Sequence, residues 1–342
     1  MKRRSFLLFM APSLAVMLAL LLLPILLAAW QAVHNSYVKM EIRTVTTVVP
    51  MFAGLTRTET RQVPQAVLDA HGRPVQVSDF TGLANFANVL EPRQVAAAFR
   101  DSPTLGTLWQ ALSDTEFVGA LIFTLVYVLA TTAGMLALGL ALALAVNNTL
   151  RRVRGGVIAA SLLPLVVTPL VGSLAVYWMF LDNGVATWAL RSTGIGQIYF
   201  MRSAFAIRAL IIGYGIWSAG PFAFIVLYAG LQTVPQETVE AARIDGASPW
   251  RVLRAVTVPH MMPLIVFVTL IHLMDSYRVF EPMLVFGSRV FANSVQFQTY
   301  YILNTEDNPN KAAAAGLLTI AGVAVLIAPS IRRLWREQRG LA

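Results

Sequence analysis

The chain has no cysteine and few charged residues, and both shortages narrow what it can do. Of its 342 residues, 13% are charged, whereas 57% are hydrophobic. Without cysteine there is no disulfide bond, no thiol nucleophile and no cysteine-based metal site. A composition this apolar exceeds that of an ordinary soluble domain and is typical of a protein that crosses a membrane several times.

Histidines are also scarce, and their spacing does not suit metal binding. They are His34, His71, His260 and His272. The sequence has no His-Glu-x-x-His motif of a metalloprotease, no Gly-x-Ser-x-Gly elbow of a hydrolase and no Gly-x-x-x-x-Gly-Lys-Ser/Thr phosphate loop. We therefore expect no catalytic residue, metal ligand or bound cofactor on this chain, and an energy source on another polypeptide.

The N-terminal part contains an apolar run from about Phe6 to Trp30, preceded by basic residues at positions 2–4. A secretory signal peptide begins in the same way, and residues 27–29 resemble a weak cleavage site. The run is longer than the apolar part of a usual signal peptide, and it is long enough to span a hydrocarbon core of roughly 30 Å. We therefore predict a retained transmembrane helix over residues 1–30.

Residues 31–116 differ from the rest of the chain because charges of both signs are spread through them. Residues 45–49 are rich in β-branched side chains, which favour strands, and residues 69–74 have the composition of a turn. We predict a small extracytoplasmic insertion that contains β-strands.

Five further apolar segments are each long enough for a transmembrane helix. They cover roughly residues 117–146, 157–180, 205–231, 261–285 and 312–331. The predicted fold is therefore an all-α polytopic membrane protein with about six transmembrane helices. Residues 117–331 form its core and residues 332–342 form a C-terminal tail.

Basic residues predict the orientation of the chain in the membrane. Arginines gather in the connections 147–156 and 232–260 and in the tail, whereas the connections 181–204 and 286–311 carry few basic residues. The positive-inside rule places the arginine-rich connections and both termini in the cytoplasm. Because the net charge of +9 lies at the ends of apolar runs, it indicates contact with membrane lipids rather than nucleic acid.

The connection 232–260 begins with the signals of a short helix. Pro235 suits a first helical turn, where Glu237 and Glu240 complement the positive end of the helix dipole. Gly246 suits the left-handed conformation that ends a helix. A compact helix at this place can fit a groove in a partner protein.

A second helix is predicted directly afterwards. Ser248 is a typical N-cap, and Pro249 suits the first position of the helix. Pro259 and Pro263 are predicted to break the chain where it re-enters the membrane. A solvated loop is the alternative, but such loops rarely need two sets of start and stop signals.

The same connection resembles the EAA signature of ABC importer permeases. Glu240-Ala241-Ala242 is followed after three residues by Gly246 and, after a further nine residues, by Val256-x-Val258-Pro259. Family members usually have isoleucine and leucine in place of the two valines. Residues 81–86, 139–143 and 163–164 also resemble segments of maltose- and glycerol-phosphate-type permeases, so the resemblance covers roughly residues 80–335. The Gly-Gly-Pro often found in relatives near residues 287–310 is missing, which leaves the substrate class open.

The resemblance implies a subunit of a sugar importer in a bacterial inner membrane that works by alternating access. Its expected partners are a second homologous permease subunit, two ATPase domains that carry ATP and Mg, and an extracytoplasmic substrate-binding protein. The loop 232–260 would be the coupling loop that docks into a cleft on the ATPase. Its coupling residues would be Glu237, Glu240, Ala241, Ala242, Asp245, Gly246 and Pro259. Alternatives are a receptor or scaffold, or an importer of a polyol or glycerol phosphate.

One group of candidates for substrate binding lies in the segment 261–285. His272, Asp275, Ser276 and Val279 follow the i, i+3, i+4, i+7 spacing of one helix face. An ionisable group inside the bilayer costs roughly 2.5–3.5 kcal/mol, so it faces protein or a water-filled cavity. The alternative is an interhelical contact, for example between His272 and Asp275. The resemblance favours the cavity, because the helix after the EAA loop lines the sugar site in maltose-type permeases.

A second group lies in the segment 205–231. It consists of Tyr214, Trp217, Ser218 and Phe222. Aromatic rings stack on sugars, and the small residues Gly215 and Ala219 leave room for a ligand, although small residues also serve close helix packing. Ligand contact and packing both remain open for this face. Arg278 and Glu281 are either an ion pair at an outer gate or a pair that snorkels to the interface.

Overall fold

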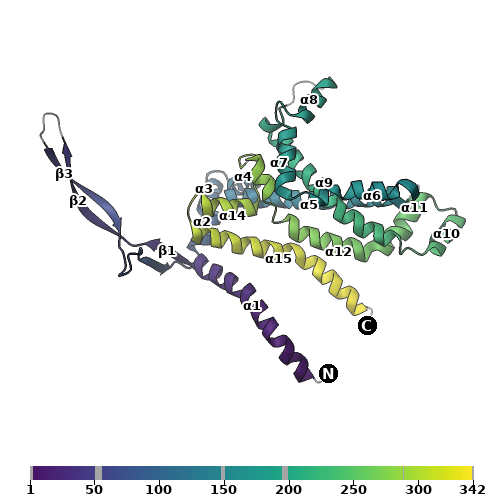
Figure 1. The fold of residues 1–342 in the computed structure, drawn as a ribbon, viewed down its shortest axis with the longest axis horizontal. Helices are drawn as coiled ribbons and strands as arrows, with labels where there is room; N and C mark the ends of the chain where they lie inside the picture. Colours follow the sequence, from purple (N-terminus) through teal and green to yellow (C-terminus); the bar gives the residue numbers. More distant parts are fainter. Residues whose placement is uncertain (1–2, 51–55, 148–150, 195–198, 288, 341–342) are drawn as a thin grey trace. The chain divides into compact units, whose positions relative to one another are not determined.

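The computed structural model describes residues 3–50, 56–147, 151–194, 199–287 and 289–340 (Figure 1). Residues 148–150 of the predicted cytoplasmic connection and the last two residues of the predicted tail lie outside the described residues. The chain forms two compact units, Met1–Leu90 with Ile302–Leu317 and Glu91–Tyr301 with Leu318–Ala342.

The first unit combines a long helix with two antiparallel strand pairs. Its elements are α1 (Arg3–Val33), β1 (His34–Val38), β2 (Met40–Pro50), β3 (Thr56–Ala66), β4 (Gln76–Phe80) and α2 (Ala84–Leu90). β1 pairs with β4, and β2 pairs with β3 in the extended hairpin of Figure 1. At the predicted turn, the Asp69 carboxylate accepts hydrogen bonds from the backbone N–H groups of His71 and Arg73, at 2.8 and 2.9 Å. The predicted β-structure of the insertion is confirmed.

The segment 81–86 holds the C-terminal end of α1. The last carbonyls of a helix have no partner inside it and need donors from elsewhere. The side-chain amide of Asn85 donates to the carbonyls of Ala32 and His34, at 3.1 and 3.0 Å, and the backbone N–H of Thr81 donates to the carbonyl of Val33 at 2.9 Å. Because Asn85 is buried, this segment has a structural role inside the first unit.

The second unit is helical. It contains α3 (Pro92–Asp101), α4 (Leu105–Asp114), α5 (Glu116–Asn147), α6 (Arg151–Val166), α7 (Pro169–Met179), α8 (Val185–Ser192), a 3₁₀ turn (Phe200–Arg202), α9 (Ala204–Leu231), α10 (Gln236–Ile244), α11 (Pro249–Val252), a π-helical turn (Leu253–Thr257), α12 (Val258–Ser276) and α13 (Glu281–Phe286). Two further helices, α14 (Val295–Asn304) and α15 (Pro309–Gly340), belong partly to each unit.

In the described part of the chain, five helices are long and apolar enough to cross a membrane, and a bent pair of helices is a sixth span if it is counted as one. The predicted all-α polytopic fold is confirmed.

That bent pair replaces the single straight helix expected over residues 157–180. α6 and α7 meet at an angle of 97°. Thr168, between them, has an extended backbone (φ −64°, ψ 145°) because it precedes Pro169, and the residue before a proline disfavours the helical conformation. The expectation of one continuous helix over residues 157–180 is therefore wrong at this point.

The segment expected over residues 261–285 also differs from the structure. α12 ends at Ser276, so Val279 does not share a helix face with His272. At the other end, Pro259 and Pro263 do not break the chain, because helix runs from Pro249 to Ser276 through the π-helical turn. Val258 donates to the carbonyl of Leu253, five residues back, and Pro259 then falls in a first turn, where proline is tolerated.

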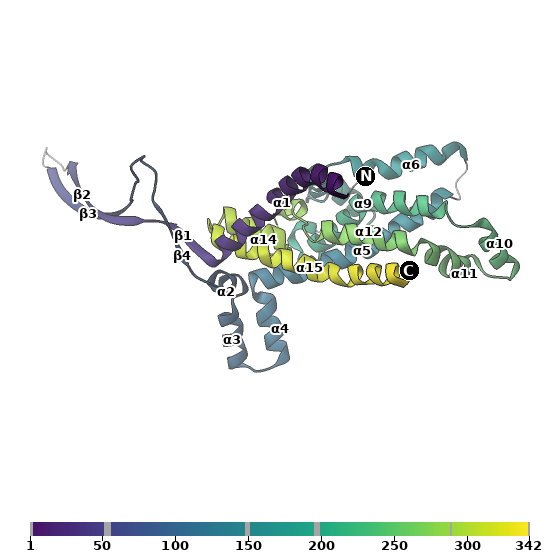
Figure 2. The same cartoon turned by 90° about the horizontal axis from the view of Figure 1, so that it is seen from below.

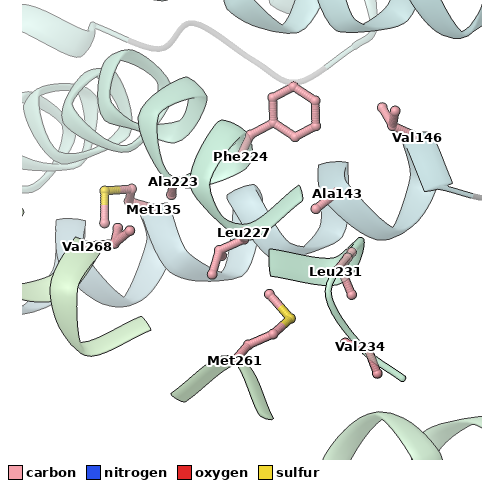
Figure 3. Packing of buried hydrophobic residues seen from close by; sticks show 10 residues of the cluster. All are labelled: Met135, Ala143, Val146, Ala223, Phe224, Leu227, Leu231, Val234, Met261 and Val268. Atoms are coloured by element: carbon pink, nitrogen blue, oxygen red, sulfur yellow. The ribbon is translucent and has the colours of Figure 1, made fainter. Parts of the chain in front are cut away.

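The core of the second unit lies between α5, α9 and α12, which run side by side in both views (Figures 1 and 2). Figure 3 shows its buried residues, Met135, Ala143, Val146, Ala223, Phe224, Leu227, Leu231, Val234, Met261 and Val268. Gly139 allows the backbones of α5 and α9 to approach each other closely. A Cβ added there would lie 2.6 Å from the Cβ of Ala223 and 2.8 Å from the backbone nitrogen of Phe224. The helices therefore pack through a small residue, as is common in membranes.

We predict that Gly139→Ala lowers the free energy of unfolding by about 1–3 kcal/mol, because the added methyl group forces the backbones of α5 and α9 apart. Titration with a denaturing detergent, followed by the loss of helical signal, measures this change. Gly213→Ala on α9 is the matched control, since a Cβ there meets no atom within 4 Å. Equal stability of the two variants would contradict the packing described for Gly139.

Candidate functional site

A cavity of about 200 Å³ lies among α5, α7, α9, α12 and α13. Its walls carry hydroxyl groups, an imidazole and charged groups of both signs. The lining residues are Tyr127, Pro169, Tyr214, Gly215, Ser218, Ala219, His272, Asp275, Ser276, Arg278, Val279, Glu281 and Pro282. The two candidate groups, which lie more than 50 residues apart in the sequence, therefore meet at one place.

Most candidate substrate residues line this cavity, and two do not. Those brought together are Tyr214, Ser218, His272, Asp275, Ser276 and Val279. Val279 lies beyond the end of α12 but still reaches the cavity wall. Trp217 points elsewhere and is 44% exposed, and Phe222 packs against the core between α5, α9 and α12. For Phe222 the structure thus favours the packing role that the sequence left open.

Tyr214 connects α9 to the bend between α6 and α7. Its hydroxyl donates to the carbonyl of Pro169, at 2.9 Å, where α7 begins. Gly172, one turn further along α7, leaves room for this ring, because an added Cβ would lie 2.6 Å from the Tyr214 hydroxyl oxygen. Gly215 has the same role for Tyr127, whose hydroxyl would clash with a side chain there. Two glycines thus allow two tyrosine hydroxyls to reach the cavity.

His272 forms a contact between α12 and α5. Its Nε2 lies 3.1 Å from the Oγ1 of Thr131, and that hydroxyl donates to the carbonyl of Tyr127 at 2.7 Å. A hydroxyl has one hydrogen, so Thr131 accepts from a protonated Nε2, and Nδ1 of a neutral imidazole is left as an acceptor. The interhelical contact that the sequence offered as an alternative exists, but its partner is Thr131 rather than Asp275, and His272 also lines the cavity.

Three charged side chains border the cavity beside these hydroxyls. They are Asp275, Arg278 and Glu281. Within the described residues, no ion pair joins Arg278 to Glu281, so of the two alternatives for these residues the gate ion pair is not formed in this structure. Asp275 is exposed, whereas His272 and Ser276 are buried. The cavity therefore offers hydrogen-bond donors and acceptors together with an exposed carboxylate, that of Asp275, and a half-buried one, that of Glu281.

Tyr127 is a lining residue that the sequence reasoning missed. It belongs to a buried polar face of α5, together with Thr124 and Thr131, in an otherwise apolar helix. Their spacing of three and four residues was a usable signal, because it places all three on one side of the helix. Pro169 was missed as well, since its place in the cavity depends on the bend after α6.

The predicted coupling loop forms the short helix α10, which lies at one end of the helical bundle (Figures 1 and 2). Gly246 has a φ of +79°, and Ala247 and Gly246 donate to the carbonyls of Ala242 and Arg243, each at 3.0 Å. This arrangement is a Schellman motif, which satisfies the last carbonyls of the helix. The Oγ of Ser248 accepts from the backbone N–H of Arg251 at 3.4 Å and caps the next helix as predicted.

The loop residues singled out from the sequence lie mostly at the surface. Exposed are Glu237, Glu240, Ala241, Asp245, Gly246 and Pro259, whereas Ala242 is half-buried. Pro235 precedes the helix as its N-cap instead of lying in the first turn. Val239 packs against the core and fixes α10 to the bundle.

Two large apolar side chains on this loop were also missed. Ile244 is 86% exposed and Trp250 is 70% exposed. Neither is shielded by other residues of the loop, although both are costly to leave in water. Tryptophan is enriched among the residues that dominate protein–protein contacts, so the exposed Trp250 is a candidate for such a contact. The sequence did carry a signal for this exposed surface, because Ile244 and Trp250 lie between Arg243 and Arg251.

Comparison with known proteins gives consistent matches. Residues 135–333 match the family model described as "Binding-protein-dependent transport system inner membrane component". The chain is 26% identical over 269 residues to a probable ABC transporter permease of Sinorhizobium fredii, which covers 77% of this chain and 79% of that protein. It is 28% identical over 260 residues to the trehalose transport system permease protein SugA of Mycobacterium tuberculosis, covering 72% of each.

A solved structure has the same fold. A chain of a bacterial ABC transporter involved in import of the acidic polysaccharide alginate aligns with a TM-score of 0.59 and 21% identity, covering 73% of this chain and 91% of that one. The family match spans more than half of the chain and includes α10 and all of the cavity lining except Tyr127. With its several apolar helices, the chain is a multi-pass inner membrane protein. It belongs to the family of binding-protein-dependent transport system inner membrane components, the permease subunits of ABC transporters.

Proposed function

We propose that this chain is the permease subunit of an ATP-driven importer that moves a sugar by alternating access. The observation that carries the proposal is the cavity between α5, α9 and α12, which joins hydroxyl, imidazole and carboxylate groups inside a bundle of apolar helices. Such groups match the hydroxyls of a sugar, each of which donates and accepts hydrogen bonds. Relatives named for transport of trehalose, and of trehalose and maltose, support a sugar as the solute.

The charges of the cavity favour a neutral solute over an anionic one. The lining contains two carboxylates, Asp275 and Glu281, and one guanidinium, that of Arg278. A phosphorylated solute such as glycerol phosphate would meet an excess of negative charge, and like charges placed together destabilise a complex. A neutral sugar or polyol has no such cost.

The small volume of the cavity supports the proposal that a second permease subunit completes the solute site. About 200 Å³ is less than the roughly 300–1,000 Å³ of typical ligand sites. A homologous subunit across the same face would enlarge the cavity and enclose the solute. An extracytoplasmic binding protein would deliver the sugar to the side opposite α10.

The energy for transport would come from two partner ATPase domains that bind ATP and Mg. In this proposal α10 docks into a cleft of the ATPase, with Ile244 and Trp250 in apolar contact and Glu237, Glu240 and Asp245 at the rim. α10 joins α9 to the helix that ends at Ser276, and those two helices carry most of the candidate substrate residues. A displacement of α10 would therefore move the walls of the cavity. Both termini and α10 would lie in the cytoplasm.

We predict that Gly246→Ala uncouples ATP hydrolysis from uptake in proteoliposomes that contain the whole transporter. The left-handed backbone costs alanine about 1–2 kcal/mol, which lowers the equilibrium constant for forming the correctly shaped loop about 5- to 30-fold. Uptake of radiolabelled sugar should fall accordingly, while basal ATPase activity remains. Gly246→Asn should retain most of the uptake, because asparagine tolerates this conformation.

The matched control is Gly194→Ala. Gly194 has a φ of +81° and, like Gly246, no atom within 4 Å of an added Cβ, but it lies outside the loop. It should cost similar stability and leave the ratio of uptake to ATP hydrolysis unchanged. If Gly246→Ala transports as well as the control, α10 is not the coupling element.

We predict that Asp275→Asn raises the KM for sugar uptake about tenfold or more, because a hydrogen bond to a charged group contributes about 1.5–3 kcal/mol. Uptake of labelled trehalose, maltose and glucose into ATP-loaded proteoliposomes measures this effect, and glycerol 3-phosphate serves as the anionic comparison. Asp182→Asn is the control, since Asp182 pairs with Arg202 away from the cavity. Uptake of glycerol 3-phosphate in preference to every sugar would contradict the neutral solute.

A further inference from the structure

A second hollow of the helical unit is separate from the proposed sugar cavity. It is a groove of about 940 Å³ between the first halves of α5 and α9. Ile122 and Val126 of α5 face Phe205, Ile212 and Ile216 of α9 along its wall. Val126 is 51% exposed and Phe205 is 83% exposed, so the groove opens to the surroundings of these helices. Its volume falls within the range of known ligand sites.

Four charged residues surround the mouth of the groove, and two of them neutralise each other. Arg289 lies 2.6 Å from the Glu116 carboxylate, which also accepts from the side-chain amide of Gln298 at 2.8 Å. The guanidinium of Arg289 further stacks over the ring of Tyr301, 3.5 Å from its centroid. This pair fixes the rim of the groove but offers little net charge to a ligand.

The other two charges, Arg208 and Asp114, form no ion pair among the described residues, although the Arg208 guanidinium lies over the ring of Phe123, 5.8 Å from its centroid. The Nε of Arg208 donates to the carbonyl of Phe291 at 2.6 Å, which orients the guanidinium. Its remaining four N–H groups have no acceptor among the described residues, and the side chain is exposed. Asp114 is the exposed last residue of α4 and forms no ion pair within the described part of the chain. The mouth thus holds one oriented cation and one anion.

The location of these charges matches the headgroup region of a membrane. α5 and α9 have 32 and 28 residues, whereas about 20 residues span the hydrocarbon core. Arg208 lies in the second turn of α9, and Asp114 lies two residues before the start of α5, so both lie at the start of an apolar span. The apolar wall of the groove continues from there along the two helices.

We propose that this groove binds a phosphatidylethanolamine molecule. Its acyl chains lie along the wall, its phosphate binds Arg208, and its ammonium group binds Asp114. Arginine presents paired N–H groups that match phosphate oxygens, and the carboxylate supplies the opposite charge for the amine. An apolar helix of a partner would instead bury both charges without compensation, which is costly. The inference holds whichever solute is transported.

The test is native mass spectrometry of the assembled transporter with equimolar phosphatidylethanolamine and phosphatidylglycerol. The wild type should retain phosphatidylethanolamine preferentially. Arg208→Gln should lower retention of both lipids about fivefold, the effect expected for one basic residue at a lipid headgroup. Asp114→Asn should abolish the preference. Gly213→Leu should lower retention of both, because Gly213 lines the groove and has room for a side chain.

Two variants control for general effects of these substitutions. Arg202→Gln removes an arginine that pairs with Asp182 outside the groove, and Gly156→Leu adds a leucine at an open position of α6. Both should retain lipid as the wild type does. Equal retention of the two lipids by the wild type, or an equal loss with Arg208→Gln and Arg202→Gln, would overturn the proposal.

A protein occupant is tested separately. Gly213→Cys creates the only thiol of the chain, because the natural sequence has no cysteine. In membranes that contain the whole transporter, a lipid-borne thiol reagent should label it. A crosslink from this cysteine to another subunit, without labelling from the lipid phase, would show that a protein fills the groove and would overturn the proposal.

Discussion

The close contact between α5 and α9 is the constraint on which the other features of the helical unit depend. Gly139 brings the two backbones together, and the buried residues around it fix the register of one helix against the other. That register places Tyr127 beside Gly215 and Thr131 within reach of His272 on α12. The same pair of helices forms the walls of the lipid groove, so one contact determines both hollows.

The proposed transport cycle follows from the order of elements along the chain. α9 leads through Val234 into α10, and the Schellman motif at Gly246 turns the chain into the helix that ends at Ser276. The proposed coupling element therefore lies between the two helices that carry Tyr214 and His272. At the cavity, the hydrogen bond from Tyr214 to Pro169 connects α9 to the bend after α6, so that motion of α9 also reaches α7. The proposed cycle therefore needs no additional linkage between the proposed ATPase contact on α10 and the cavity.

Local signals explain which features the sequence predicted well. Apolar length placed α5 and α9 within one residue at each end, and single residues with special backbone preferences, Gly246 and Ser248, identified the turn between two helices. The 97° bend at Thr168 was missed because an apolar run does not show where it changes direction, although Pro169 was present. The contact between Thr131 and His272 joins residues 141 positions apart and depends on packing that no local pattern encodes. Hence the helices were predictable, whereas the composition of the cavity was only partly so.

The measurement that tests this account most directly is the accessibility of the cavity from the two sides of the membrane. Ser218→Cys places a single thiol in the cavity of a chain that has no other cysteine. In sealed vesicles with the complete transporter, a membrane-impermeant thiol reagent is applied to one side, with and without a non-hydrolysable ATP analogue. Alternating access predicts that nucleotide moves the labelling from one side to the other. Labelling from the same side in both conditions would contradict it.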